Sequence, residues 1–275
     1  MKVSVHLRGG NNKTDVRAEA LAAGLQAAGC TVQKLGRGER SDGELIVQTG
    51  FGRTVALMEA INDGKPYLIA EAPCFRDFYN INKASNFTYC GLAGGGIRPD
   101  APSQERPRPK LLNSCGTRTL IIGQKPTDHS LRGSDHVGWI LEKLEEYPEA
   151  SFRHHPLMVP HQTLPSIPQA FKGIRKVVTY TSTMAIDAVI HGLDVIAEGL
   201  GSEYRSDRSR DELIHQLSWS SFTHTELSTA EVGQHILSGF EVARERARAG
   251  RQEIPRGRVD GRAVCERYYR ALEGI

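Results

Sequence analysis

Two stretches of the chain alternate β-like runs with helix-like segments, and this alternation constrains the fold more than any other feature. In the first stretch, segment 14–28 places apolar residues on one helical face and stops at Gly29. The expected order is strand 2–7, helix 14–28, strands 31–35 and 44–48, helix 54–62 and strand 66–70. Such alternation predicts a doubly wound α/β unit.

The alternation is interrupted once and then returns. Residues 71–113 contain a glycine run and a proline-rich stretch, which we interpret as a long functional loop leading into an interdomain linker. The second series comprises strand 119–123, helix 136–146, strands 150–153 and 177–180, helix 184–190 and strand 194–198. We expect a first lobe over 1–113, a second over 114–243, and a basic helical tail over 244–275 that can pack back on the first lobe.

Composition narrows the class of protein. A chain of 275 residues with 39% hydrophobic content suits a soluble globular protein. No apolar run approaches the roughly 18 residues of a membrane span, so neither an export signal nor a membrane anchor is expected. The five cysteines are scattered without the spacing of a zinc site, which predicts reduced thiols in a cytoplasmic protein.

The net charge of +3 is concentrated at the end of the sequence, where nine arginines face five acidic residues from Arg244 onward. A solvated helical surface explains such a tail, but arginines that neutralise phosphates would give the same pattern. Two common nucleotide motifs are missing: segment 6–15 does not contain GxGxxG, and no GxxxxGK[ST] occurs. A two-lobed α/β arrangement still favours a nucleotide ligand, because such sheets bind ligands at the carboxyl ends of their strands.

The segment 179–198 is the most informative for function. Its pattern predicts a strand, a turn with Thr181, Ser182 and Thr183, a helix, a glycine stop and another strand. Hydroxyls beside the free N–H groups of a helix N-terminus suit a phosphate. An ordinary helix cap by Ser182 or Thr183 is the alternative.

Two further strand ends carry polar residues. Arg153 can neutralise a phosphate bidentately, and one of His154 and His155 can donate a hydrogen bond to it, before Pro156 fixes the exit of the chain. Adjacent strand residues face opposite sides, so at most one histidine is expected to face the ligand. At the third strand end, a glycine permits close approach of a ligand, and hydrogen-bond donors and acceptors follow it. A solvated turn is the alternative for this segment. Its residues are Gly123, Gln124, Lys125, Asp128 and Ser130.

Together these segments resemble the bacterial capsule polysaccharide glycosyltransferases, the group that includes the Kdo transferases of capsule assembly. That family carries a strand followed by a GQ…D.S loop, a K.HP strand end and a T.ST…A…G helix, in this order. The matching residues are Gly123, Gln124, Asp128 and Ser130, then Arg153, His155 and Pro156 with arginine for lysine, then Thr181, Ser182, Thr183, Ala188 and Gly192. The resemblance covers residues 119–205.

This resemblance implies a GT-B-like α/β fold, with two Rossmann-like lobes around a cleft and a C-terminal helical tail. The second lobe would grip a nucleotide-sugar donor, with the HP and ST motifs around its phosphate and with no metal site or other cofactor. The chain departs from the family in being much shorter and in the segment after Gly199. It is also similar to phage glycosyltransferases that decorate hydroxymethylated pyrimidines in DNA, on the basis of size, loop 71–98 and the Trp219…Glu226 region.

Transfer to a hydroxyl requires a group that accepts its proton, and the expected place is a strand end of the first lobe. Glu71 is the first candidate and Asp77 the second, with His6 and Asp15 as further options; His155 is the catalytic candidate of the second lobe. Glu198, at another strand end, is expected to accept from a ribose or sugar hydroxyl.

Loop 75–96 is the expected acceptor site, and a packed loop without a catalytic role is the alternative. Its four aromatic residues among asparagines suit either a base or a sugar ring: Phe78, Tyr79, Phe87 and Tyr89. We expect a glycosyltransferase that uses a nucleotide sugar and a polymeric acceptor, with hydroxymethylated phage DNA favoured over a surface polysaccharide. A nucleotide-sugar epimerase and a non-catalytic nucleotide- or DNA-binding module remain alternatives. The sequence leaves the oligomeric state open.

Overall fold

The computed structural model describes residues 1–7, 13–36, 38–50, 54–75, 84–89, 106–131, 134–199, 209–249 and 260–273. The chain forms two compact units: unit 1 comprises Met1–Pro109 and Leu213–Ile254, and unit 2 comprises Lys110–Glu212 and Pro255–Ile275. It therefore passes between the units three times. The expected second lobe over 114–243 differs from this division, because residues 213–254 add a strand and helices to unit 1. The tail is divided as well, since the last helix belongs to unit 2.

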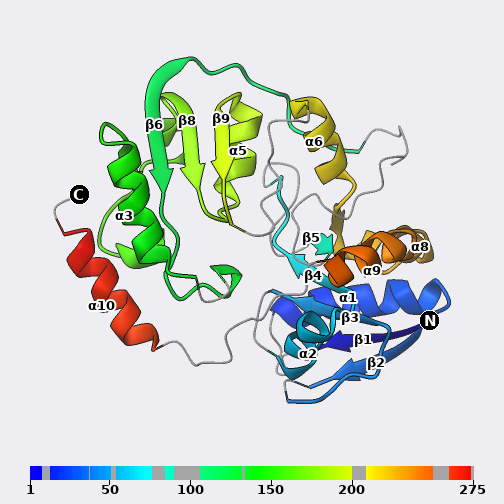
Figure 1. Ribbon diagram of the computed structural model, residues 1–275. Helices are drawn as coiled ribbons and strands as arrows, with labels where there is room; N and C mark the ends of the chain where they lie inside the picture. Colours follow the sequence, from blue (N-terminus) through cyan, green and yellow to red (C-terminus); the bar gives the residue numbers. More distant parts are fainter. Residues whose placement is uncertain are drawn as a thin grey trace. The chain divides into compact units, whose positions relative to one another are not determined.

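The sheet of unit 1 has the strand order β10-β5-β4-β3-β1-β2 (Figure 1). Its strands are β1 (Lys2–His6), β2 (Thr31–Leu35), β3 (Leu45–Thr49), β4 (Tyr67–Glu71), β5 (Ala84–Tyr89) and β10 (Ser221–Thr223). The first four strands are parallel, and β5 runs antiparallel to both β4 and β10. Every residue of β3 is buried, as expected for a central strand of a parallel sheet that is covered on both faces.

Two strands were not expected from the sequence. The segment that includes β5 was interpreted as loop, and the one that includes β10 as helical. Both are short and pair with each other across a long sequence separation, so neither shows the local period that identifies a strand.

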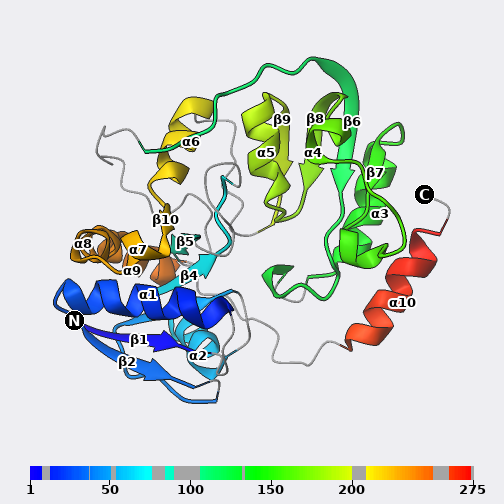
Figure 2. The ribbon, with the colours of Figure 1, turned by 180° about the vertical axis from the view of Figure 1, so that it is seen from behind.

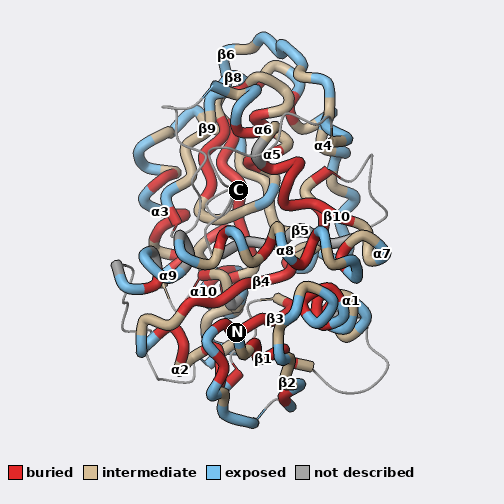
Figure 3. The backbone as a smooth tube through the Cα atoms, turned by 90° about the vertical axis from the view of Figure 1, so that its right-hand side faces the viewer, coloured by how far each residue is buried: buried red, intermediate tan, exposed pale blue. Residues whose placement is uncertain are grey.

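The helices of unit 1 are α1 (Lys13–Ala27), α2 (Val55–Asp63), the end of α6 (Arg210–Ser218), α7 (His224–Leu227), α8 (Ala230–Ser238) and α9 (Phe240–Ala249). Helices α1 and α2 contact the parallel strands, and α7 and α8 pack against α1. Figure 3 shows α1 and α2 on opposite sides of β1 and β3, as right-handed crossovers in opposite directions require. Thr54 begins α2 by accepting from the Leu57 N–H, and Gly64 ends it at φ 67°.

Unit 2 is a four-stranded parallel sheet of order β7-β6-β8-β9 with helices on both faces (Figure 2). Its strands are β6 (Gly116–Ile122), β7 (Ser151–Arg153), β8 (Gly173–Thr179) and β9 (Asp194–Ala197). Its helices are α3 (His136–Glu146), α4 (Ile167–Ala170), α5 (Met184–His191) and α10 (Gly261–Ala271), with short 3-10 turns η1 (His129–Leu131) and η2 (Pro156–Met158). The sequence therefore predicted two Rossmann-like α/β units correctly.

Each unit has its own hydrophobic core, with the strands buried between helices (Figure 3). In unit 2 the α3 side of the sheet is lined by Ile121, Ile140 and Val178, and the opposite side by Ile122, Phe171 and Val177. Within the described residues, none of the helices has the length and apolar character that crossing a bilayer demands.

Candidate functional site

The carboxyl ends of the four unit 2 strands lie in register, which brings the sequence motifs to one edge of the sheet. Ile122 of β6 pairs with Arg153 of β7 and with Thr179 of β8, and Thr179 pairs with Ala197 of β9. The segments that follow these residues carry the predicted donor-binding side chains. The strand order also reverses between β6 and β8, and such a switch point is where open α/β sheets bind ligands.

A side chain joins the two strand ends at this switch point. The Gln124 Nε2 donates to Thr181 Oγ1 at 2.7 Å, and the Thr181 N–H donates to Gln124 Oε1 at 2.6 Å. This double hydrogen bond, the Gln124–Thr181 clamp, connects the loop after β6 to the turn before α5. Gln124 is buried, so water does not compete for these two hydrogen bonds and the clamp holds the two segments together.

The rest of the β6 loop is held by local bonds. Ser130 Oγ lies 3.2 Å from Thr181 Oγ1, and the Ser130 N–H donates to Asp128 Oδ1 at 2.8 Å. Gly123 has a packing role in the structure. A Cβ there would come 2.7 Å from Cζ of Phe152, so the missing side chain makes room for a neighbouring ring.

His136 is a residue of this edge that sequence reasoning missed. It is 2% exposed and its Nε2 accepts from the Gln124 N–H at 3.0 Å. Its ring stacks on Trp139 with centroids 5.3 Å apart, and Trp139 meets Tyr180 edge-on at 5.5 Å. Burial lowers the pKa of His136 to about 4, against the opposing charges of Asp128 and Asp135. The neutral imidazole therefore orders the main chain beside the clamp.

Glu198 holds neighbouring side chains of its own unit. Its Oε2 accepts from Trp139 Nε1 at 2.7 Å and its Oε1 lies 2.9 Å from Lys143 Nζ. Burial lowers the pKa of Lys143, but the hydrogen bonds that Lys143 donates to Glu146 and Glu198 outweigh this effect, and the net pKa is raised. A hydroxyl of a ligand would have to share Glu198 with these two partners.

The end of β7 separates its two histidines. His154 Nδ1 lies 3.0 Å from the Tyr268 hydroxyl, whereas His155 Nδ1 accepts from the Leu157 N–H at 3.2 Å. Burial lowers the pKa of His155, offset by the charge of Asp128 and assisted by that of Lys125, so His155 is an electrostatic neighbour of the β6 loop. In the neutral ring the proton is then on Nε2, which is available to donate.

Arg153 adds a positive charge to this edge. Its guanidinium is partly buried, and burial lowers its pKa from the ordinary value. Within the described parts of the chain, no carboxylate or carbonyl pairs with it. A partly desolvated arginine of this kind is suited to an anionic ligand.

The hydroxyl turn before α5 has a divided role. Ser182 Oγ accepts from the Met184 N–H at 3.3 Å, and Thr183 occupies the N-cap position without a cap bond from its side chain. The N-terminus of this eight-residue helix thus points its dipole at the same edge as the clamp.

Two of the unit 1 candidates, His6 and Glu71, end strands at the corresponding edge of its sheet. His6 ends β1 and is buried, next to the switch point between β1 and β3. Glu71 ends β4, and its charge offsets the effect of burial on the pKa of Arg17, so Glu71 and Arg17 are electrostatic neighbours. Asp15 lies in the first turn of α1. Asp77 and the aromatic pair Phe78 and Tyr79 lie outside the described residues.

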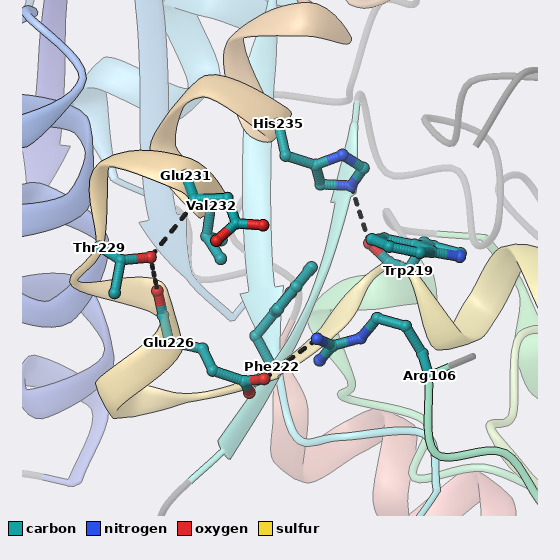
Figure 4. Close-up of a pocket in the computed structure, with 8 residues that line it drawn as sticks. All are labelled: Arg106, Trp219, Phe222, Glu226, Thr229, Glu231, Val232 and His235. Carbon is teal, nitrogen blue, oxygen red and sulfur yellow. Dashed lines mark hydrogen bonds and ion pairs between the residues drawn. The ribbon is translucent and has the colours of Figure 1, made fainter. Parts of the chain in front are cut away.

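A pocket of about 210 Å³ opens in unit 1, and Figure 4 shows the side chains around it. Arg106 spans it: Nη1 meets Glu226 Oε1 at 3.0 Å, Nη2 donates to the Ser221 carbonyl at 2.8 Å, and its guanidinium lies 4.2 Å from the centroid of Phe222. Glu226 Oε2 in turn closes a capping box with Thr223. These contacts attach Arg106, which lies just before the chain enters unit 2, to β10. We therefore assign the pocket a structural role in unit 1.

The fold and the edge together define a class: a two-unit, Rossmann-like α/β protein with an anion-suited edge in its second unit. Neither a protein-family model nor a curated protein matches the sequence. Among solved structures, it is similar to "Thermosulfurimonas dismutans KpsC, beta Kdo 2,7 transferase" at 12% identity and a TM-score of 0.46, over 85% of this chain and 99% of that one. At this level of similarity, function has to be argued from the site itself.

Proposed function

We propose that the protein is a glycosyltransferase that holds a nucleotide-sugar donor at the carboxyl edge of unit 2 and transfers its sugar to a hydroxyl of a saccharide acceptor. The observation that carries the proposal is the Gln124–Thr181 clamp. It joins, at the switch point of the sheet, two of the three motifs that resemble the capsule glycosyltransferases, and the third motif ends the adjacent strand β7.

The chemistry of this edge suits a leaving phosphate. When the bond from the sugar to the donor phosphate breaks, the phosphate oxygen keeps the electron pair and gains negative charge. Arg153 supplies a positive charge, His155 a neutral Nε2–H donor, and the N-terminus of α5 a favourable dipole with the hydroxyls of Ser182 and Thr183. These groups stabilise the transition state in which that charge develops.

The acceptor hydroxyl requires a base, and we place it among the strand ends of unit 1. Glu71 is the first choice and Asp77 the second, with His6 and Asp15 as further options. The base takes the proton as the hydroxyl oxygen bonds to the anomeric carbon of the sugar.

A saccharide is the better acceptor proposal than DNA. The motifs gathered at the edge are those of the capsule-type resemblance. One feature that favoured DNA, the Trp219…Glu226 region, is engaged in holding Arg106: Glu226 pairs with it and Phe222 packs against it. We therefore favour the surface polysaccharide alternative.

The direct test is incubation of the purified protein with a panel of nucleotide sugars, with and without saccharide acceptors. Release of free nucleotide and labelled sugar on a saccharide supports the proposal. Absence of turnover with every donor would overturn it, and interconversion of the donor without an acceptor would identify an epimerase. Transfer to hydroxymethylated DNA but to no saccharide would restore the DNA hypothesis.

Alanine variants test the donor edge. Ser182→Ala and His155→Ala are each expected to weaken donor binding by roughly 1–3 kcal/mol, as the loss of charge-assisted hydrogen bonds would. Ser151→Ala is the matched control, because Ser151 begins β7 at the opposite end of the strand and is exposed. Unchanged binding in both site variants, measured by calorimetry, would show that the donor lies elsewhere.

A further inference from the structure

The last helix of the chain, α10, packs in unit 2 after the preceding segment has contributed to unit 1. Figures 1 and 2 both show it beside α3, which it contacts. Tyr268 and Leu272 enter the core formed by Ile121 and Ile140. This apolar packing accounts for the attachment of α10 to unit 2, but it does not account for the polar contacts of α10.

Those polar and close contacts reach three separate segments of the donor edge. The Tyr268 hydroxyl meets His154 Nδ1 at 3.0 Å, directly after β7. Arg267 binds Asp135, the residue that caps α3 and precedes His136, through two bonds of 2.8 and 3.0 Å. At the start of α10, a Cβ on Gly261 would lie 3.2 Å from Thr127 Cγ2 in the β6 loop.

Tyr268 is the most specific of these contacts. It is 1% exposed, and burial raises the pKa of its phenol, so the hydroxyl keeps its proton. It hydrogen-bonds with His154 Nδ1, and the tautomer of the His154 ring sets which of the two groups donates. The Tyr268 ring also meets the His154 ring edge-on at 6.0 Å, and His154 meets Phe152 in the same way at 4.8 Å. If α10 only covered the core, phenylalanine would serve as well as tyrosine, since a buried hydroxyl costs free energy to desolvate.

We propose that Tyr268 is a positioning residue for donor binding, which acts through His154 to fix the exit of β7 and thereby the places of Arg153 and His155. This inference rests on the proposed function. Tyr268 itself does not touch the donor. It sets the geometry of the residues on either side of His154, of which Arg153 carries the charge and His155 the neutral donor.

The test is Tyr268→Phe, which removes one oxygen and keeps the buried ring. We expect the dissociation constant of the nucleotide donor, or its KM, to rise about fivefold to tenfold, as the loss of one buried hydrogen bond would give, with kcat changed less than the KM. Tyr269→Phe is the matched control: it lies on the same helix and is 50% exposed, so it should bind the donor like the wild type. Thermal melts of all variants separate loss of the fold from loss of binding.

A double-mutant cycle shows whether the effect passes through His154. In a His154→Phe background, adding Tyr268→Phe should have no further effect on the donor dissociation constant. An equal loss in both backgrounds would overturn the proposed route. Arg267→Gln, at a half-exposed position, tests the second contact without disturbing the core, and a smaller rise in the same constant is expected.

The outcomes distinguish the two proposals. If the wild-type protein binds no nucleotide or nucleotide sugar of the panel, the proposed function fails, and the inference fails with it. If the wild type binds a donor and Tyr268→Phe binds it equally well, the inference alone is overturned.

Discussion

His136 has to remain uncharged, because its Nε2 accepts the hydrogen bond from the Gln124 N–H and cannot do so once it is protonated. Folding therefore favours the neutral ring, and the pKa of about 4 expresses that preference. The unfolded chain binds the proton at a higher pH, near 6.5. The contribution of His136 to stability is thus complete above pH 6.5 and declines as the pH falls toward 4.

We expect the free energy of unfolding of the wild type to lose up to about 3 kcal/mol over this range on account of His136 alone. His136→Gln keeps an acceptor near the Nε2 position but has no proton to gain, so its stability should depend less on pH. Urea denaturation of both proteins at pH 7, 6, 5 and 4.5 measures the difference. Parallel pH profiles would contradict the assignment of the buried neutral ring.

The clamp gives a second prediction for a single residue. Gln124→Met removes both hydrogen bonds to Thr181 while keeping the length of the side chain. Donor binding should weaken by roughly 1–3 kcal/mol, because the turn before α5 loses its tie to the β6 loop. Gln162→Met, at an exposed position in the same unit, is the control and should bind the donor normally. The donor dissociation constants of both variants, measured by calorimetry, test this prediction, and equal values would contradict it.

Sequence reasoning found the residues of this edge that follow a strand directly. Gln124, Arg153 and Thr181 could be placed because parallel strands end at one edge of a sheet. Tyr268 could not, since its partner His154 lies 114 positions away and only the tertiary fold brings them together. His136 looked like an ordinary helix residue, and its role depends on a peptide N–H that no pattern of side chains reveals.

At the scale of elements, two glycines that end helices differ in the space that is available for a side chain. Gly29, after α1, has φ 90° with open space around an added Cβ. Gly192, after α5, has φ 80°, and a Cβ there would lie 2.7 Å from the Leu112 carbonyl oxygen. Helix α5 therefore ends against the linker as well as in a left-handed turn.

Alanine substitutions separate the two effects. Gly29→Ala should cost about 1 kcal/mol, from the strained backbone alone, and Gly192→Ala clearly more, because the carbonyl has to move as well. Chemical denaturation gives both values. An equal loss of unfolding free energy in the two variants would show that the Leu112 carbonyl moves aside without a cost in stability.

The elements that the sequence predicted well are those with a complete local pattern. Helix α3 begins and ends at the predicted residues, because twelve consecutive positions contain both its apolar face and its cap, Asp135. Strands β5 and β10 could not be found in this way. β5 is stabilised by hydrogen bonds to β4, at the edge of the parallel strands, and to β10, whereas β10 pairs with β5.

For the whole molecule, the order of the chain through the two units predicts which fragments can fold. Residues 1–109 alone lack β10 and the buried side chains of Phe222, Leu227 and Ile236, which belong to the unit 1 core. We expect this fragment to be unfolded or aggregated by circular dichroism and gel filtration. A fusion of 1–109 to 213–254 through a flexible linker restores the core and should unfold cooperatively. A stable fold of the short fragment would contradict this prediction.

The pairing of β5 with β10 also has a consequence during translation. β5 leaves the ribosome early, yet its partner is made only after nearly all of unit 2 has been translated. At roughly 5–20 residues per second, the edge of β5 waits on the order of ten seconds for β10. During that time it is an open template for another nascent chain. The newborn protein is therefore most vulnerable to misassembly while unit 2 is being made, and chaperone capacity should limit its yield at that stage.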